Sequence, residues 1–231
     1  MSERAPVERL ARCPKHLFQR TEAPCDPDVW GRIQDEYRPF NVFVNIPYVP
    51  EYQVLQSTIV ATLLTVGLVP RLASLRSEGQ PIRLCKICEL MQTSKYSITD
   101  LSRPELHNMP FELGYFLALG RVGHAMIMLD EKYVEREGVK VRKFDSQLSN
   151  LKSVEVIVHE TSPQKLAEEL LRRMSREVPE AQMPGKRATL VDQIVKMAKT
   201  VQDAIVAGRL DEFVEEQRML INMGRLSPPT T

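Results

Sequence analysis

The chain has 231 residues, 43% of them hydrophobic, which suffices for one substantial domain with an appendage or for two small domains. Its 31 basic and 30 acidic residues leave a formal net charge of +1, so composition gives no general case for nucleic acid or an acidic membrane surface as a partner. No apolar run approaches membrane-spanning length, and the charged N-terminal stretch lacks the apolar core of a secretory signal. We therefore expect a cytoplasmic protein with reduced thiols.

The first 39 residues are rich in proline, arginine and charge, and they predict an irregular extension anchored by Trp30. Cys13 and Cys25 flank His16 in this segment, which leaves metal binding there as a minor alternative. Cys85 and Cys88 form a CxxC, a spacing found in zinc and redox sites. Both fall on the apolar stripe of a helical pattern, and no further pair of ligands has a persuasive spacing, so we favour small core residues.

From residue 40 onward, short apolar runs alternate with helical patterns. We expect strands at 41–46, 68–73, 96–99, 124–129 and 154–159, and helices at 53–66, 82–93, 110–119 and 162–174. Pro70 indicates an edge strand or a strand end, and Ser162 followed by Pro163 is typical of a helix start. This alternation predicts an α/β fold with a parallel sheet covered on both faces, in the flavodoxin-like order 2-1-3-4-5.

Two segments lie outside this alternation. The charged stretch 130–152 predicts a hairpin or a lid, and 179–184 predicts a linker. After the linker, 188–206 and 211–222 predict two helices joined at Gly208 and Arg209, and the first carries a continuous apolar face. The expected organisation is an extension at 1–39, a flavodoxin-like nucleotide-binding domain at 40–178, and a helical hairpin at 186–224. We expect the hairpin to pack on the body of the protein or on a second subunit. The second arrangement would make the protein a homodimer.

The stretch from residue 96 to 120, YSITDLSRPELHNMPFELGYFLALG, is the most informative part of the chain. A buried strand runs into a polar loop and then into a helix that is apolar almost all round and carries Glu112 near its start. A carboxylate at that position either interacts with the positive end of the helix dipole or faces a ligand crevice at the carboxyl end of the strand. Water exclusion would raise the pKa of Glu112, as suits a catalytic group. Both interpretations remain open.

Further polar side chains converge on the same crevice if the ends of the first and third strands lie side by side. Asp100 is either a second catalytic carboxylate or the start of an Asx turn. Ser102 and Arg103 suit a phosphate or a ribose hydroxyl, with an exposed loop as the alternative. Asn108 is a ligand or, as we favour, the N-cap of the helix beginning near Pro110. The remaining candidate binding residues are Asn45, Pro47, Tyr48, Arg71, Met109 and Tyr115.

For several residues the structural interpretation is stronger. Arg71 would meet an anionic group only if it lies on the ligand edge, and a surface ion pair is the commoner outcome. Asp145 and Ser146 are expected in a solvated loop, although they lie where a lid would close. His107 is expected to be a loop residue, and His159, at the end of the fifth strand, a satisfied structural residue.

Several familiar catalytic and cofactor motifs are missing from the sequence. No GxGxxG follows the first strand, and no GxxxxGK[ST], GxSxG or HExxH occurs. The sequence thus supports neither a Rossmann dinucleotide site nor a P-loop, and we expect no metal and no bound cofactor.

The segments VFVNIPYVPEY, VPRLA, KICELMQTSKYSITDLSR and NMPFELGYFLALG resemble a set of largely uncharacterised prokaryotic proteins. Those proteins are similar in outline to nucleoside 2-deoxyribosyltransferases and to Toll/interleukin-receptor-like domains, over about residues 40–175 of this chain. In the enzymes, a glutamate early in the helix after the third or fourth strand attacks or electrostatically supports the anomeric carbon. Glu112 matches that position, and Tyr48 is similar to a tyrosine of their first loop. HNMPF stands where they carry an Asp–Ser-type turn.

The resemblance implies an N-glycosidase or ribosyl transferase that acts on a nucleoside, a nucleotide or NAD. Glu112 would stabilise an oxocarbenium-like transition state, with Asp100 or Asn108 on ribose hydroxyls and Tyr48 or Tyr115 orienting the carboxylate or stacking on the base. The alternative is a sensor that binds a nucleotide in the same crevice without turnover. Catalysis requires Glu112 to reach the crevice, whereas a structural role requires it to be buried and capped by backbone amides.

Overall fold

A computed structural model of the chain describes residues 38–73, 83–103, 108–136, 139–143 and 155–226. The expectations for the N-terminal extension, with Cys13, His16, Cys25 and Trp30, lie outside these residues. So do those for His107, Asp145 and Ser146.

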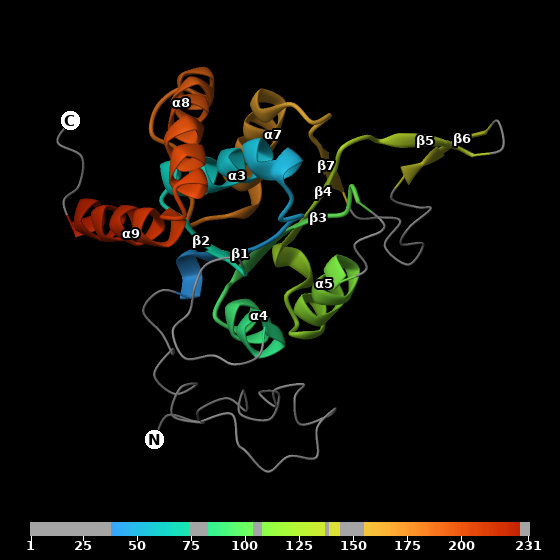
Figure 1. The fold of residues 1–231 in the computed structure, drawn as a ribbon, viewed down its shortest axis with the longest axis horizontal. Coiled ribbons are helices and arrows are strands. Elements are labelled where there is room, and N and C mark those ends of the chain that lie inside the picture. The colour runs from blue at the N-terminus through green and yellow to red at the C-terminus, as the bar shows by residue number, and fades with distance from the viewer. Residues whose placement is uncertain (1–37, 74–82, 104–107, 137–138, 144–154, 227–231) are drawn as a thin grey trace, which may run out of the picture.

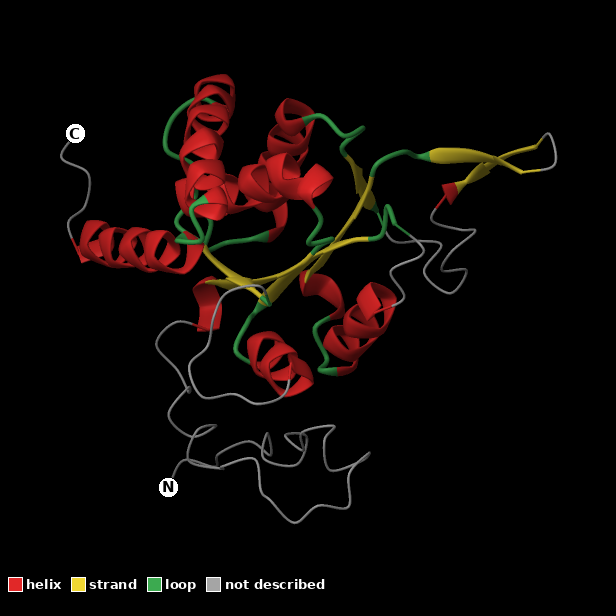
Figure 2. Ribbon diagram, viewed as in Figure 1, coloured by secondary structure: helices red, strands yellow, loops and turns green. Residues whose placement is uncertain are grey.

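The centre of the fold is a parallel sheet of five strands (Figure 1, Figure 2). The strands are β1 (Asn41–Asn45), β2 (Val69–Leu72), β3 (Tyr96–Asp100), β4 (Ala125–Leu129) and β7 (Val156–Val158). Their order is β2-β1-β3-β4-β7, which confirms the predicted flavodoxin-like topology. Every residue of β1, β3 and β4 is buried, as expected for strands covered on both faces. Pro70 lies in the edge strand β2, where a missing N–H is tolerated.

Helices cover both faces of the sheet, as Figure 1 shows. The helices on one face are α3 (Gln53–Thr65), α7 (Pro163–Glu177) and α8 (Arg187–Val206), those on the other are α4 (Arg83–Gln92) and α5 (Asn108–Ala118), and α9 (Leu210–Leu226) follows α8. Gly67, at φ 74°, follows the last turn of α3, and Ser162 caps α7 by accepting from the Lys165 N–H.

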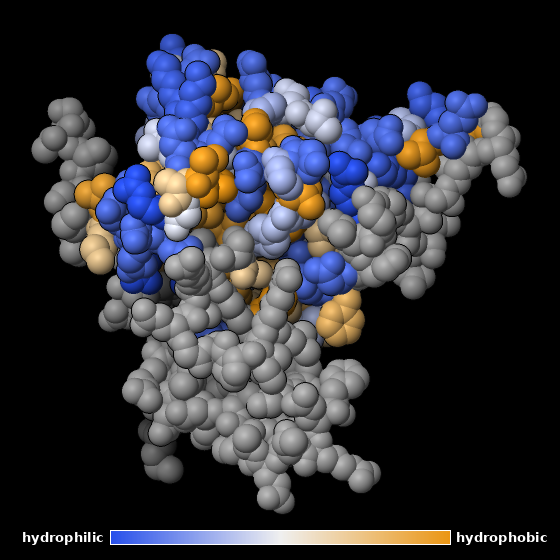
Figure 3. All heavy atoms as spheres, in the orientation of Figure 1, coloured by the Kyte–Doolittle hydropathy of each residue, from blue (hydrophilic) through white to orange (hydrophobic). Residues whose placement is uncertain are grey.

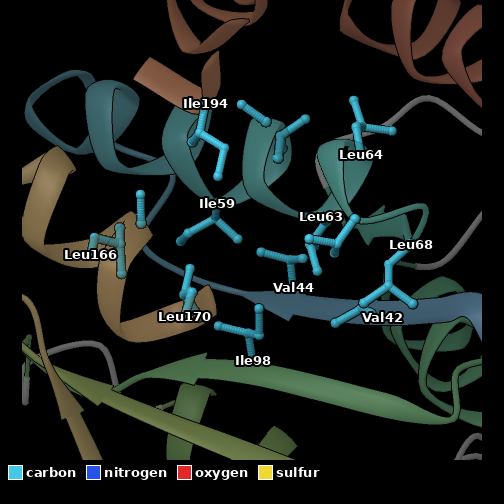
Figure 4. Packing of buried hydrophobic residues seen from close by; sticks show 14 of the residues in the cluster. Val42, Val44, Ile59, Leu63, Leu64, Leu68, Ile98, Leu166, Leu170 and Ile194 are labelled. Atoms are coloured by element: carbon cyan, nitrogen blue, oxygen red, sulfur yellow. The ribbon is translucent and has the colours of Figure 1, made fainter. Parts of the chain in front are cut away.

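The larger core lies between the sheet and α3, α7 and α8. Figure 4 shows side chains of β1 and β3 packed against α3 and α7, with Ile194 of α8 reaching the same cluster. Helix α3 is buried along nearly its whole length, because the sheet covers one side and α8 the other. Its nearly uniform apolar composition therefore reflects a central position. The predicted C-terminal hairpin thus packs on the body of the protein, and α8 is part of its main core.

A second core lies between the sheet and helices α4 and α5. It joins Phe43 and Ile127 of the sheet to Leu113 and Phe116 of α5 and to Cys88 of α4. The Cys88 thiol is buried among apolar side chains, in agreement with the core interpretation of this cysteine.

A buried arginine joins α4 to the turn after α5. The Arg121 guanidinium donates to the carbonyls of Met91, Gln92 and Ser94 at the carboxyl end of α4. The negative end of the helix dipole also stabilises a cation at this position. The guanidinium also lies 5.5 Å from the centre of the Phe116 ring. This arrangement fixes α5 relative to α4.

The predicted linker is fixed to the amino-terminal edge of the sheet. The Glu180 carboxylate accepts from the Lys95 ammonium and, at 2.6 Å, from the Tyr96 hydroxyl, and the Gln182 N–H donates to the Val66 carbonyl. Partial burial raises the pKa of Glu180, but the hydrogen bonds from Lys95 and Tyr96 outweigh it and hold the pKa below its usual value.

A carboxyl group whose pKa is lowered by folding contributes stability above its unfolded pKa, and the contribution disappears as the pH falls through the folded value. We expect Glu180→Gln to lower the free energy of unfolding by about 1 kcal/mol at pH 7. The difference from the unmodified protein should shrink below about pH 4, near the ordinary glutamate pKa. Urea unfolding across a pH series measures this, and a difference independent of pH would contradict the assignment.

After β4 the chain leaves the sheet as an antiparallel hairpin, β5 (Tyr133–Arg136) with β6 (Val139–Arg142), which projects from the body in Figure 1. The hairpin predicted for the charged stretch is therefore confirmed for its described part. Figure 3 shows hydrophilic side chains over α8 and along this hairpin. Within the described residues, no helix combines the length and the apolar character needed to cross a membrane.

Candidate functional site

The carboxyl ends of β1 and β3 lie side by side, with Asn45 opposite Thr99. The chain runs outward from this pair in both directions, to β2 on one side and to β4 and β7 on the other, so this is the topological switch point of the sheet. The Asn45 side-chain amide donates to the Met109 carbonyl at 3.2 Å. This bond holds the first turn of α5 over the end of β1, and it brings together the predicted residues Asn45 and Met109 and the helix that carries Glu112.

Helix α5 begins at Asn108, two residues before the expected start at Pro110. Asn108 is thus already helical and is not the N-cap, so the N-cap prediction is wrong. A proline is compatible with this longer helix because the N–H groups of the first turn have no intrahelical partner. The Asn108 amide instead donates to Glu112 Oε1, one turn further on, at 3.3 Å.

Glu112 is 6% exposed, in the second turn of α5. It lies on the buried side of the helix together with Met109, Leu113 and Phe116, which pack in the core beneath the sheet. The Asn108 side-chain amide, at the entrance of the helix, is one of its hydrogen-bond donors. Glu112 is therefore largely removed from water beside the switch point, which does not match a fully exposed catalytic group.

Asp100 ends β3 and has no exposed surface. Its Oδ1 accepts from the Ser102 N–H at 2.7 Å, which is an Asx turn, and its Oδ2 lies 3.0 Å from His159 Nε2. Of the two interpretations of Asp100, the geometry matches the Asx turn. Ser102 is also buried, so only Arg103 is exposed in the part of this loop that the structure describes.

His159 completes this buried cluster. Its Nε2 lies 3.2 Å from Ser102 Oγ, and its Nδ1 accepts the Thr161 N–H at 3.1 Å. Since a backbone N–H donates to Nδ1, the ring is neutral and carries its proton on Nε2. In a Ser-His-Asp triad the serine and the aspartate contact different ring nitrogens. Here both contact Nε2, so the cluster does not activate Ser102 as a nucleophile.

The turn after His159 has an unusual backbone. Glu160 and Thr161 have φ of 49° and 55°, and the Ser162 N–H donates to the His159 carbonyl at 2.8 Å. A β-turn with positive φ at both central positions normally contains glycine, asparagine or aspartate there. A β-branched threonine in this region is strained.

Replacing Thr161 by glycine should relieve this strain. We expect Thr161→Gly to raise the free energy of unfolding by about 1 kcal/mol, the relief of strain exceeding the added entropy of the unfolded chain. Thr161→Ala is the matched control, because it removes the same hydroxyl and keeps the strained backbone. Urea unfolding measures the free energy of unfolding of both variants. If the glycine variant is no more stable than the alanine variant, the backbone at Thr161 is not strained.

The two tyrosines predicted to contact substrate are tied to neighbouring elements. The Tyr48 hydroxyl donates to the Val44 carbonyl at 3.1 Å and accepts from the Ala73 N–H at 3.2 Å, which fastens the loop after β1 to the end of β2. The Tyr115 hydroxyl accepts from the Gln92 side-chain amide at 2.9 Å, which joins α5 to α4. These contacts give both hydroxyls structural roles. Pro47, directly after β1, is buried.

Arg71 does not lie on the ligand edge, contrary to the prediction. It pairs in register with Phe43, the middle residue of β1, and belongs to the edge strand. Burial lowers the pKa of its guanidinium, and the carboxylate of Glu89 acts in the opposite direction. Further charges near Arg71 come from Glu215 and Arg218 of α9. The residue therefore belongs to the junction of β2 with α4 and α9.

The sequence predicted His159 as an isolated structural residue and did not predict its contacts with Asp100 and Ser102. The position of Asp100 and His159 in the sequence could have indicated them: each stands at the carboxyl end of a parallel strand, so both lie on the same edge of the sheet. Elsewhere, a hollow of about 150 Å³ lies between α8 and α9, lined in part by Asp203, Arg209 and Glu212. It is smaller than the roughly 300 Å³ at which small-molecule sites begin.

Within the described parts of the chain, no three histidine, cysteine, aspartate or glutamate side chains gather as metal ligands. The strand order defines a flavodoxin-like α/β fold whose topological switch point lies between β1 and β3. No protein-family model, no curated protein and no solved structure matches the chain.

Proposed function

We propose that the protein binds a nucleoside, a nucleotide or NAD at the switch point and cleaves or transfers its N-glycosidic bond through Glu112. The observation that carries the proposal is the position of Glu112. It is a carboxylate removed from water, on the helix that follows β3, and that helix is held over the end of β1 by Asn45. Open α/β sheets bind their ligands at this edge.

The chemistry suits a desolvated carboxylate. Breaking an N-glycosidic bond develops positive charge on the anomeric carbon and the ring oxygen, and a fixed negative charge beside them lowers the barrier. The interaction is stronger where water is excluded. The Asn108 amide donates to Oε1 of Glu112 and so orients the carboxylate beside the switch point.

The same edge suits a phosphorylated ligand. Helices α3, α5 and α7 each follow a strand of the parallel sheet, so their amino termini, which attract anions, lie toward this edge. Arg103 supplies an exposed guanidinium in the loop after β3. A nucleotide or NAD therefore fits this edge better than a free nucleoside.

A second function follows from the low exposure of Glu112. In this second function the 6% exposed carboxylate holds a ribose hydroxyl or the start of α5 and cleaves no bond. The protein would then bind a nucleotide and signal its presence to a partner without turnover.

The experiment is incubation of the purified protein with NAD, nucleosides and nucleoside monophosphates, with chromatography to detect free base and a thermal-shift assay in parallel. Release of base from one member of the panel supports the enzyme. A thermal shift without release supports the binding module. The absence of both for every compound would contradict both functions.

A further inference from the structure

We infer that His159 is a positioning residue of this site: its neutral imidazole fastens the β3 exit loop (residues 100–103) to the β7–α7 turn (residues 159–162). His159 thereby sets the geometry of the carboxyl edge, and only its effect on catalysis rests on the proposed function.

The sheet itself does not join these two segments. Strand β4 lies between β3 and β7, and it pairs with each of them separately. Beyond the strands, the Leu101 N–H donates to the Met128 carbonyl at 3.0 Å, and the His159 N–H donates to the Leu129 carbonyl at 2.9 Å. The imidazole of His159 then spans the end of β4 to reach Asp100 and Ser102. It is thus a direct connection between the two outer segments.

The connection is buried and hydrogen-bonded at both ends. Asp100 and His159 are 0% exposed, so each of their polar atoms needs a protein partner. The Nε2–H is shared by Asp100 Oδ2 and Ser102 Oγ, and Nδ1 is occupied by the Thr161 N–H. The strained turn places the Thr161 N–H opposite Nδ1. The positive φ angles of Glu160 and Thr161 therefore serve to form this hydrogen bond.

A third segment also contacts the ring. Tyr52, in the 3-10 turn Pro50–Tyr52 that precedes α3, packs edge-on against His159 with ring centres 6.4 Å apart. The loops after β1, β3 and β7 therefore meet at this one imidazole. All three lie on the edge that we assign to the ligand.

The β3 exit loop carries Arg103, the exposed cation of this edge. The Asp100 and Ser102 anchors fix the backbone from which the exposed Arg103 projects. Glu112 is held separately, through the bond from Asn45 to the first turn of α5 and through Asn108. Loosening the exit loop should therefore weaken nucleotide binding more than it slows the bond-breaking step.

The test uses two substitutions in the full chain. His159→Gln keeps an amide N–H within reach of Asp100, whereas His159→Phe keeps a flat ring without any N–H. We expect the Phe variant to speed amide hydrogen exchange at Ser102 by about tenfold or more, since a buried hydrogen bond of about 1.4 kcal/mol is lost, and the Gln variant to stay within about threefold. For the base-releasing reaction, KM should rise about tenfold in the Phe variant, with kcat within about threefold.

Nuclear magnetic resonance of the unmodified protein provides a measurement that needs no variant. The nitrogen shifts of His159 should show the neutral ring with its proton on Nε2. A proton on Nδ1, unchanged exchange at Ser102 in the Phe variant, or a loss in kcat larger than the rise in KM would each overturn the inference. If no nucleotide is turned over, the proposed enzyme fails, but the ring tautomer and the exchange rates still decide the role of His159.

Discussion

Glu112→Gln is expected to reduce the rate of base release by about a thousandfold, with nucleotide affinity changed by no more than about threefold. The substitution removes the negative charge and keeps the size of the side chain. The glutamine oxygen can still accept from the Asn108 amide, which lies 3.3 Å from Oε1, so the start of α5 should keep its geometry. Charge that stabilises only the transition state affects the chemical step and not ligand binding.

Single-turnover kinetics separate the chemical step from binding and product release, and calorimetry gives the affinity. Glu168→Gln is the matched control, because Glu168 is exposed on α7 and the exchange of charge for amide is the same. The control should leave the rate unchanged. Turnover retained in Glu112→Gln would remove this carboxylate from the mechanism.

Ile194→Ala is expected to lower the free energy of unfolding by about 2–5 kcal/mol, the range for truncating a fully buried large aliphatic side chain. Ile194 is 0% exposed and packs from α8 into the cluster formed by α3 and the sheet, as Figure 4 shows. The surrounding side chains come from several elements and cannot all move to fill the cavity.

Val206→Ala, at the end of the same helix, is the control. Val206 is 74% exposed, so its truncation should change stability by no more than about 0.5 kcal/mol. Urea unfolding measures both variants. A small effect at Ile194, similar to that at Val206, would mean that α8 packs loosely on the body rather than forming part of its core.

The fold was largely predictable because its signals are local. Strands such as Asn41–Asn45 are short, apolar and rich in β-branched residues, and the helical patterns between them fix a parallel order. Pro110 predicted a helix start near residue 110, whereas Asn108 is already helical. Proline is tolerated throughout the first turn, so it marks the neighbourhood of a helix start without fixing the residue.

The site was predictable only in part. Switch-point logic correctly placed Asn45 beside the start of α5, because that logic depends on strand order alone. The cluster of Asp100, Ser102 and His159 was not foreseen, because 59 residues separate Asp100 from His159 and their contact crosses the end of an intervening strand. Arg71 was misplaced for a related reason: its level in the sheet depends on the register of β2 with β1.

The switch-point edge is the nucleotide site that we propose. Amide hydrogen exchange, measured with and without the compound from the panel that gives the largest thermal shift, tests it most directly. We predict slower exchange in the loops after β1, β3 and β7 and in the first turns of α5, with no change around Asp203 and Glu212 between α8 and α9. Protection confined to α8 and α9, or no protection at the strand ends, would contradict the account.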